Sequence, residues 1–284
     1  MVYNSKIPLA FKSLKSATPN SDSVSYNQDL LAKKALGQHF LIDSFIINQI
    51  ILAAGDLSNK NVIEIGPGKG ILTKELVLKA KTVFAIEKDE RFASLLQDLK
   101  DQHNNFDFIL TDALKINCLE TATHPSVLIS NLPYNVGTQI FLNCLMASHN
   151  SPNKFDCFVL MFQKEVAKRI VAKENDDHYG RLSIFSQLLA DVELIFEVAE
   201  TCFNPPPKVK SAVILVKPLA EMRFAVNIKN LERLTQLAFS GRRKTIRNSL
   251  KSLNLDFAAL KIDSNKRAEE LSLLECCNMA NQLI

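Results

Sequence analysis

The stretch Asn61–Gly70, with the sequence NVIEIGPGKG, decides the fold of this chain. Its first half is a short apolar run that ends in glycine, a pattern typical of a strand buried inside a parallel sheet. The glycines of its second half let the backbone turn sharply and approach a ligand closely before a helix begins at Ile71. The stretch therefore predicts a strand, a ligand-binding loop and a helix in succession.

Strand and helix patterns continue to alternate toward the C-terminus. We expect strands at 82–87, 106–111, 126–131 and 155–162, and helices at 71–79, 91–100 and 137–146. Such alternation indicates βαβ units, and hence a parallel sheet with helices on both faces. Two later strands, at 192–198 and 211–217, are separated by a proline-rich turn too short for a crossover helix, so they should pair antiparallel.

The character of the sequence changes at both ends of this region. Residues 33–218 are predicted to form the α/β domain, and residues 219–284, which carry no convincing strand, a small all-helical domain. Residues 1–32 are polar and rich in serine and asparagine, so we expect a flexible extension. An organelle transit peptide is the alternative, although the extension contains no arginine.

Composition sets limits on the partners. Among 284 residues, 34 Lys and Arg stand against 30 Asp and Glu, and a net charge of +4 allows a polyanionic partner without requiring one. The six cysteines form neither a C-x2-C pair nor a zinc-spaced cluster, so we expect no metal and a reducing, cytoplasmic location. No apolar run is long enough to span a membrane. We also expect a monomer.

The spacing in the glycine loop excludes two common nucleotide-binding motifs. A dinucleotide fingerprint needs glycine where Ile71 stands, and a Walker A loop needs Ser or Thr after Lys69, where Gly70 follows. Two carboxylates favour a different adenosine ligand. Glu87 ends the next strand, where an acid accepts ribose hydroxyls, and Asp112 follows the third strand, where it can accept the adenine amine. An adenosine ligand without pyrophosphate fits S-adenosylmethionine; solvated strand ends are the alternative.

The tetrapeptide Asn131–Tyr134 (NLPY) follows the fourth strand directly, at the edge where open α/β sheets bind ligands. The side-chain oxygen of Asn131 and the carbonyl of Leu132 can accept the two N–H bonds of an aromatic amine and make its nitrogen more nucleophilic. Tyr134 offers a face for stacking a base, which must be single-stranded or flipped out. Phe203 forms either a second aromatic wall or part of the core. An ordinary Asn-Pro turn is the alternative.

A basic stretch, Gly241–Arg247 (GRRKTIR), lies in the predicted helical domain. Arg243, Lys244 and Arg247 should form a positive face suited to contacts with phosphates. Further basic residues that can extend this face are Lys33, Lys34, Lys164, Lys168 and Arg169. A solvated charged helix is the alternative.

Together these segments resemble the ribosomal RNA adenine dimethyltransferase family, and most closely its small-subunit (16S) branch, whose bacterial members confer kasugamycin sensitivity. The matching stretches are Leu36–Leu41, Glu64–Gly70, Ile86–Glu87, Asp112, Asn131–Tyr134, Gln163–Glu165, Tyr179–Ser183, Phe203–Lys208 and Gly241–Arg247. The resemblance implies a Rossmann-like seven-stranded S-adenosylmethionine methyltransferase sheet with a small all-helical C-terminal domain. It further implies dimethylation of the N6 amines of two adjacent adenosines in the 3′-terminal hairpin loop of small-subunit ribosomal RNA, within the immature small subunit.

The resemblance also implies roles for individual residues. Contacts with the cofactor are expected from His39, Leu41, Gly66, Gly68, Glu87, Asp112 and Asn131. His39 is a departure, because many members of the family carry asparagine there; both side chains can donate a hydrogen bond, so we expect the contact to be kept, with some sensitivity to pH.

Three other functions stay open at this point. The macrolide-resistance methyltransferases of large-subunit RNA share the architecture, and DNA adenine methyltransferases share the Asn-x-Pro-Tyr chemistry; Tyr179–Ser183 and Phe203–Lys208 favour the small-subunit branch. A non-catalytic RNA-binding assembly factor is the third alternative, and the intact Asn131–Tyr134 and Glu87 argue against it.

Overall fold

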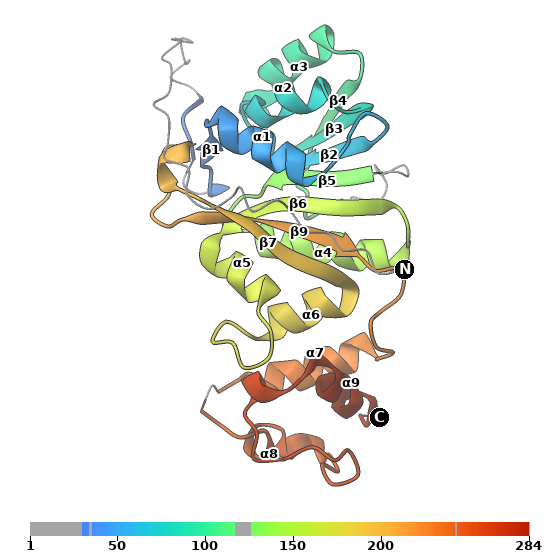
Figure 1. Ribbon diagram of the computed structural model, residues 1–284. Coiled ribbons are helices and arrows are strands. Elements are labelled where there is room, and N and C mark those ends of the chain that lie inside the picture. The colour runs from blue at the N-terminus through green and yellow to red at the C-terminus, as the bar shows by residue number, and fades with distance from the viewer. Residues whose placement is uncertain (1–29, 34–35, 117–125, 242, 284) are drawn as a thin grey trace.

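A seven-stranded sheet forms the centre of the molecule in the computed structural model, which describes residues 30–33, 36–116, 126–241 and 243–283 (Figure 1). Its strands are β2 (Asn61–Ile65), β3 (Thr82–Glu87), β4 (Phe106–Leu110), β5 (Ser126–Asn131), β6 (Phe155–Gln163), β7 (Ala190–Val198) and β9 (Ser211–Pro218). They lie in the order β4-β3-β2-β5-β6-β9-β7. The predicted flexible extension falls almost wholly on residues 1–29, outside the described residues, as do Lys34 and Arg242.

The direction of the strands agrees with the sequence pattern. Neighbours from β4 to β6 are parallel, whereas β9 is antiparallel to both β6 and β7. The predicted antiparallel pairing of the two late strands is thus confirmed. From β2 the chain first builds outward through β3 and β4 and then returns to add β5 and β6 on the other side. Such a reversal creates a crevice at the carboxyl ends of β2 and β5, where open α/β sheets bind ligands.

Helices cover both faces of the sheet. One face packs against α1 (Ser44–Ala53), α2 (Ile71–Val77) and α3 (Ala93–Gln102), and the other against α4 (Gly137–Asn150), α5 (Lys164–Val171) and α6 (Arg181–Leu189). In β2, Val62 belongs to the first apolar cluster and Ile63 to the second, because successive side chains of a strand point to opposite faces. Both residues are 1% exposed, as expected for a strand covered on both sides.

After β9 the described residues contain helices, turns and a single isolated bridge between Thr245 and Arg267. The α-helices are α7 (Ile228–Ala238), α8 (Ile246–Ser249) and α9 (Leu273–Asn281), and Lys251–Leu253 and Ala268–Glu270 form short 3-10 helices. They form a group below α6 in Figure 1, and their buried side chains join the same apolar cluster as α4 and α6. Within the described part of the chain, no helix has the length and apolar character needed to cross a membrane.

A two-stranded sheet outside the main one joins distant segments. β1 (Phe40–Leu41) pairs antiparallel with β8 (Phe203–Asn204), so that Leu41 lies opposite Phe203. Strands of two residues have no periodicity, so the sequence pattern could not reveal them. The pairing holds the segment before α1 against the proline-rich turn between β7 and β9.

Candidate functional site: a cavity at the switch point of the sheet

A cavity of about 120 Å³ opens at the carboxyl ends of β2, β3 and β5. Its lining contains the predicted cofactor and catalytic residues, which are His39, Leu41, Gly66, Gly68, Glu87, Asp112, Asn131, Leu132 and Tyr134. These residues come from separate parts of the chain, and the topology of the sheet brings them to one place. Arg243, Lys244 and Arg247 do not line the cavity; all three are exposed on the helical group.

The glycine loop between β2 and α2 forms the floor of the cavity. Gly66 and Gly68 have φ angles of 72° and 54°, in the left-handed region that side chains disfavour. A β-carbon added at Gly68 would come within 3.0 Å of the Phe40 ring. The Gly68 N–H donates a hydrogen bond of 2.9 Å to the carboxylate of Glu87. Glycine at this position therefore both permits the loop and connects it to β3.

Glu87 is held by backbone donors on two sides. Besides the bond from Gly68, its other carboxylate oxygen accepts the N–H of Asp89 at 2.7 Å. The side chain is only 5% exposed, and this burial raises the pKa of the carboxyl, while the two backbone N–H groups act in the opposite direction. An acceptor fixed in this way can receive hydroxyl donors from a ligand without reorganising.

Glu64 is a cavity residue to which the sequence analysis gave no role. It is 2% exposed, and its Oε2 accepts a hydrogen bond of 2.7 Å from the Thr73 hydroxyl. Burial raises its pKa to about 8, the Thr73 hydrogen bond opposes this change, and the neighbouring Glu87 charge adds to it. An acid inside the apolar strand was the signal that could have revealed it, because buried carboxyls are rare without a function.

Asp112 lies at the rim of the cavity, on the loop after β4. Its carboxylate accepts the Leu114 N–H at 3.0 Å and forms an ion pair of 2.8 Å with the exposed Lys88. The Lys88 ammonium holds the pKa of Asp112 below its usual range. This acid is therefore ionised and able to accept a further donor.

The side chain of Asn131 is oriented by the segment of β1. Its Nδ2 donates a hydrogen bond of 3.0 Å to the backbone carbonyl of His39, so the oxygen is the end of the amide that is left to accept a ligand donor. The next residue, Leu132, is 2% exposed. The carbonyl of Pro133 accepts the N–H of Gly137 at 2.7 Å, which anchors the tetrapeptide to the start of α4.

His39 connects Tyr134 to the proline-rich turn. The His39 and Tyr134 rings lie 5.2 Å apart between centroids, and His39 Nδ1 donates to the Pro205 carbonyl at 2.9 Å. The Tyr134 hydroxyl forms a hydrogen bond of 2.5 Å with the Ser211 hydroxyl. Burial raises the pKa of Tyr134, so its hydroxyl keeps its proton.

The structure decides between the two roles that the sequence left open for Phe203, a second aromatic wall and a residue of the core. Its side chain is 2% exposed, does not line the cavity, and belongs to the apolar cluster that includes Leu41 and Ile47. The prediction of a second aromatic wall is therefore wrong for this structure. The pairing of β8 with β1 buries the ring in the core, next to a segment that lines the cavity.

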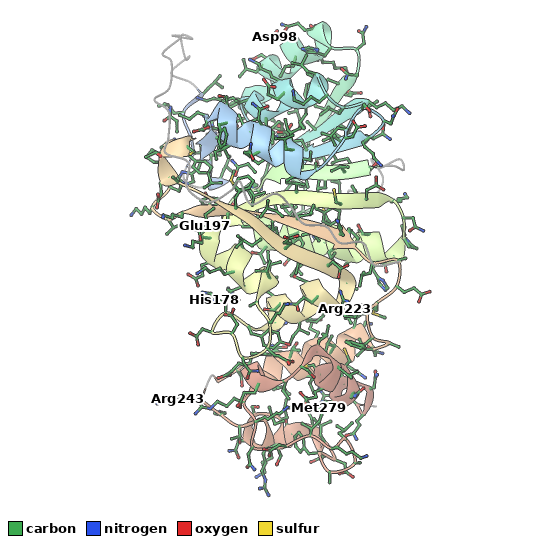
Figure 2. All side chains as sticks on the ribbon, viewed as in Figure 1. Asp98, His178, Glu197, Arg223, Arg243 and Met279 are labelled. Atoms are coloured by element: carbon green, nitrogen blue, oxygen red, sulfur yellow. The ribbon has the colours of Figure 1, made fainter. Side chains whose placement is uncertain are left out.

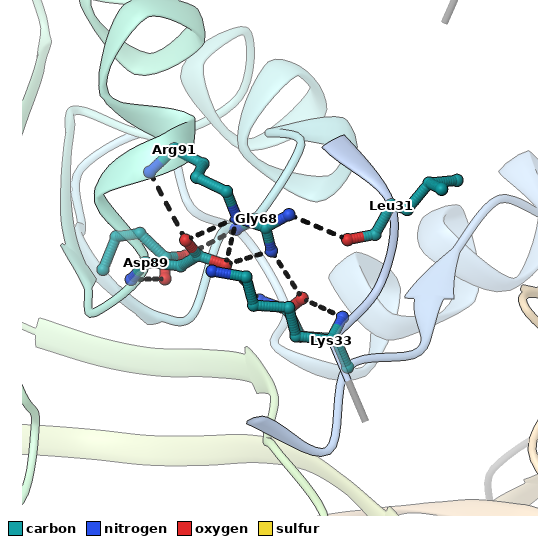
Figure 3. A network of polar contacts seen from close by, with 7 residues as sticks. Leu31, Lys33, Gly68, Asp89 and Arg91 are labelled. Atoms are coloured by element: carbon teal, nitrogen blue, oxygen red, sulfur yellow. Dashed lines mark hydrogen bonds and ion pairs between the residues drawn. The ribbon is translucent and has the colours of Figure 1, made fainter. Parts of the chain in front are cut away.

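A polar network lies beside the cavity and reaches its lining at Gln38 (Figure 3). Asp89 accepts hydrogen bonds from Gln38 Nε2 at 2.9 Å and from the Arg91 guanidinium, which holds the pKa of Asp89 at about 2. Arg91 also donates to the Leu31 carbonyl at 3.0 Å, and the Lys33 N–H donates to Gln38 Oε1 at 2.8 Å. These bonds attach the segment before β1 to the loop after β3. The sequence offered no signal for them, because they join residues far apart in the chain.

Comparison with known proteins identifies the family. The model for ribosomal RNA adenine dimethylase matches residues 30–284. This chain belongs to the ribosomal RNA adenine dimethylase family. The family predicted from the sequence motifs is thereby confirmed.

Two curated relatives of this dimethylase show how far the similarity extends. The chain is 43% identical to the ribosomal RNA small subunit methyltransferase A of Wolbachia sp. subsp. Brugia malayi (strain TRS) over 260 residues. The aligned region covers 89% of this chain and 98% of that protein. It is 43% identical over 270 residues to the protein of the same name from Allorhizobium ampelinum, covering 93% and 98%.

Solved structures confirm the fold of the dimethylase. A dimethyladenosine transferase from Plasmodium falciparum matches with a TM-score of 0.71 and 30% identity, covering 86% of this chain and 98% of that one. The 23S rRNA methyltransferase ErmE shares the fold with a TM-score of 0.67 at 24% identity, covering 86% and 99%. The predicted methyltransferase sheet is thus found.

Among the described residues, no group of three or more His, Cys, Asp or Glu side chains is arranged to hold a metal ion.

Proposed function

We propose that this protein transfers methyl groups from S-adenosylmethionine to the N6 amines of two adjacent adenosines in the 3′-terminal hairpin loop of small-subunit ribosomal RNA, dimethylating each. The observation that carries the proposal is the position of Asn131–Tyr134 on the wall of the cavity that also contains Glu87 and Asp112. Family membership and the small-subunit methyltransferase relatives support the choice of substrate.

The chemistry of the cavity fits S-adenosylmethionine. Glu87 would accept the ribose hydroxyls and Asp112 the adenine amine, while the buried Glu64 lies in the same cavity as a partner for the ammonium of the methionine part. A buried carboxyl without a cationic partner among the described side chains favours a cationic ligand group. Gly66, Gly68, His39 and Leu41 would complete the contact surface. When bound, the cofactor supplies a methyl group already activated by its sulfonium.

The protein would then act by positioning the adenine amine. The oxygen of Asn131 and the carbonyl of Leu132 accept its two N–H bonds, which directs the nitrogen lone pair toward the methyl group. Tyr134 stacks on the base, and such stacking contributes about 1–3 kcal/mol. His39 and Ser211 hold the Tyr134 ring in place through the contacts described above.

The RNA would be held outside the cavity. Residues 219–284 form the proposed RNA-binding domain, in which Arg243, Lys244 and Arg247 contact phosphates. The substrate is the immature small subunit during ribosome biogenesis. The protein acts as a monomer in the cytoplasm.

Methyl transfer to isolated small subunits tests the proposal. Subunits from cells that lack the modification, incubated with labelled S-adenosylmethionine, should gain about four methyl groups each, two on each of two accessible bases. Asn131→Ala should lower the rate by roughly 10²–10³-fold, because it removes one of the two fixed acceptors. No transfer with tight subunit binding would indicate an assembly factor instead, and transfer to large-subunit RNA would overturn the choice of substrate.

A further inference from the structure

A second hollow lies beside the cleft, between the start of α5 and the residues that precede β9. It is an open groove of about 390 Å³, and its lining includes Lys164, Lys168, His178, Val209 and Lys210. A neighbouring hollow shares Lys168 and His178, but its lining also includes Asp176 and Asp177, so the groove proper is the more basic of the two. The groove is separate from the cavity of Glu87 and Asn131, and no residue lines both.

The backbone that forms the groove also supports the catalytic tyrosine. Ser211, whose hydroxyl bonds to that of Tyr134, follows Lys210 directly and lies opposite Gln163 in the β6–β9 pair. The Lys164 N–H donates to the Lys210 carbonyl at 2.8 Å. The groove is therefore connected to the Tyr134 wall of the cavity through Ser211, so an RNA chain leaving the cavity on this side would meet it.

The charges of the groove favour an anionic partner. Lys168 and Lys210 form no ion pair with any described carboxylate, whereas Lys164 pairs with Glu197 at 2.7 Å. Glu165 is the acidic residue in the lining. Lys210 is exposed, whereas Lys168 is half-buried and also acts electrostatically on Asp176, whose pKa it helps to lower. A lysine that contacts a phosphate releases counterions condensed on the nucleic acid, which makes such a contact favourable.

The form of the groove favours a chain over a small anion. It is open to solvent, and Val209, 46% exposed, adds an apolar surface beside Lys210 that suits a ribose or a base face. Figure 2 shows His178, at this groove, and Arg243, on the helical group, along the same side of the molecule. The groove and the basic stretch of the helical group therefore lie on the same side of the molecule.

We propose that this groove binds the sugar–phosphate backbone of the RNA segment adjoining the target adenosine, through Lys168 and Lys210. The inference rests on the proposed function and adds to it a second phosphate-binding surface, on the methyltransferase sheet itself. A base that enters the cleft leaves its flanking phosphates outside, and the groove provides an exit path for one flank.

Charge reversal with a matched control tests this inference. Lys168→Glu with Lys210→Glu should weaken binding of the hairpin RNA by about tenfold at moderate salt. The slope of log Kd against log salt should fall by roughly 1.4–1.8, as expected for two lost phosphate contacts. Lys74→Glu with Lys81→Glu makes the same change of net charge at two exposed lysines away from the groove, and it should leave the slope unchanged.

The outcomes separate the two proposals. Equal RNA affinity and slope for the groove variant and its control, while the unaltered protein methylates small subunits, overturn the groove and spare the proposed function. Failure of the unaltered protein to bind or methylate the RNA overturns the proposed function. If thermal unfolding shows that the glutamates destabilise the fold, Lys168→Gln with Lys210→Gln takes their place, with half the expected change in charge.

Discussion

The cavity and the helical group differ in how they hold charged side chains: those of the cavity are bound by the protein and mostly buried, and those of the helical group are exposed. In the cavity, Glu64, Glu87 and Asp112 each accept a hydrogen bond or ion pair from the protein, and the first two are almost fully buried. On the helical group, Arg243 and Arg247 are exposed and pair with no described carboxylate. The enclosed acids suit one small ligand in a fixed pose, while the open cations suit a polyanion with adjustable contacts. Salt should therefore affect the second region much more than the first.

Replacing Glu87 should have the largest effect on this comparison. Glu87→Ala removes the acceptor of both the Gly68 and Asp89 N–H groups and the proposed acceptor of the ribose hydroxyls. Hydrogen bonds to a charged group are worth about 1.5–3 kcal/mol each, so cofactor affinity should fall by roughly 10²-fold. Calorimetric titration with S-adenosylmethionine measures this affinity. RNA affinity should stay the same, and an equal loss of both would show that the two regions are not independent.

Reversing charge on the helical group should have a smaller effect, and it should change RNA binding instead of cofactor binding. Arg243→Glu with Arg247→Glu should weaken RNA binding by about tenfold at moderate salt and reduce its salt dependence, because phosphate contacts are lost. Cofactor titration serves as the control and should give an unchanged Kd. Unaltered RNA affinity at moderate salt would mean that these residues form only a solvated surface.

The smallest effect concerns the pH dependence of stability. The folded-state pKa of Glu64 is about 8 against an ordinary value of 4.5, so between these values the folded protein holds a proton that the unfolded chain releases. Stability must then fall as pH rises through this window. Between pH 6 and 7.5, each rise of half a pH unit lowers the free energy of unfolding by about 0.7 kcal/mol, or the Tm by roughly 1–3 °C.

Glu64→Gln isolates this contribution, since its amide oxygen can still accept the Thr73 hydroxyl. The variant should lose most of the decline in Tm with rising pH, whereas Arg243→Glu with Arg247→Glu should keep it. Thermal unfolding at several pH values provides the measurement. Parallel Tm curves for Glu64→Gln and the unaltered protein would show that Glu64 ionises normally.

The sequence was informative where structure is local. The strand patterns and the short turn before β9 predicted the sheet, and strand ends placed Glu87, Asp112 and Asn131 at one edge. It was uninformative where contacts join distant segments. The Asp89 network and the pairing of Phe203 with Leu41 depend on three-dimensional proximity that no periodicity encodes. Arg243, Lys244 and Arg247 were expected to share one face of a helix, but that helix is only Ile246–Ser249, so Arg243 and Lys244 lie before it and Arg247 alone lies within it.

The pairing of β1 with β8 has a consequence for the order in which the chain is made. Phe40 and Asn204 are neighbours in the folded protein but lie far apart in sequence. The ribosome therefore releases β1 long before β8. Until β8 emerges, the His39 ring has no Pro205 carbonyl to bind, and Leu41 has no strand opposite it. Contacts of such separation form late in folding. The nascent protein therefore fixes the part of the cavity lining that His39 and Leu41 contribute only after most of the sheet has been synthesised.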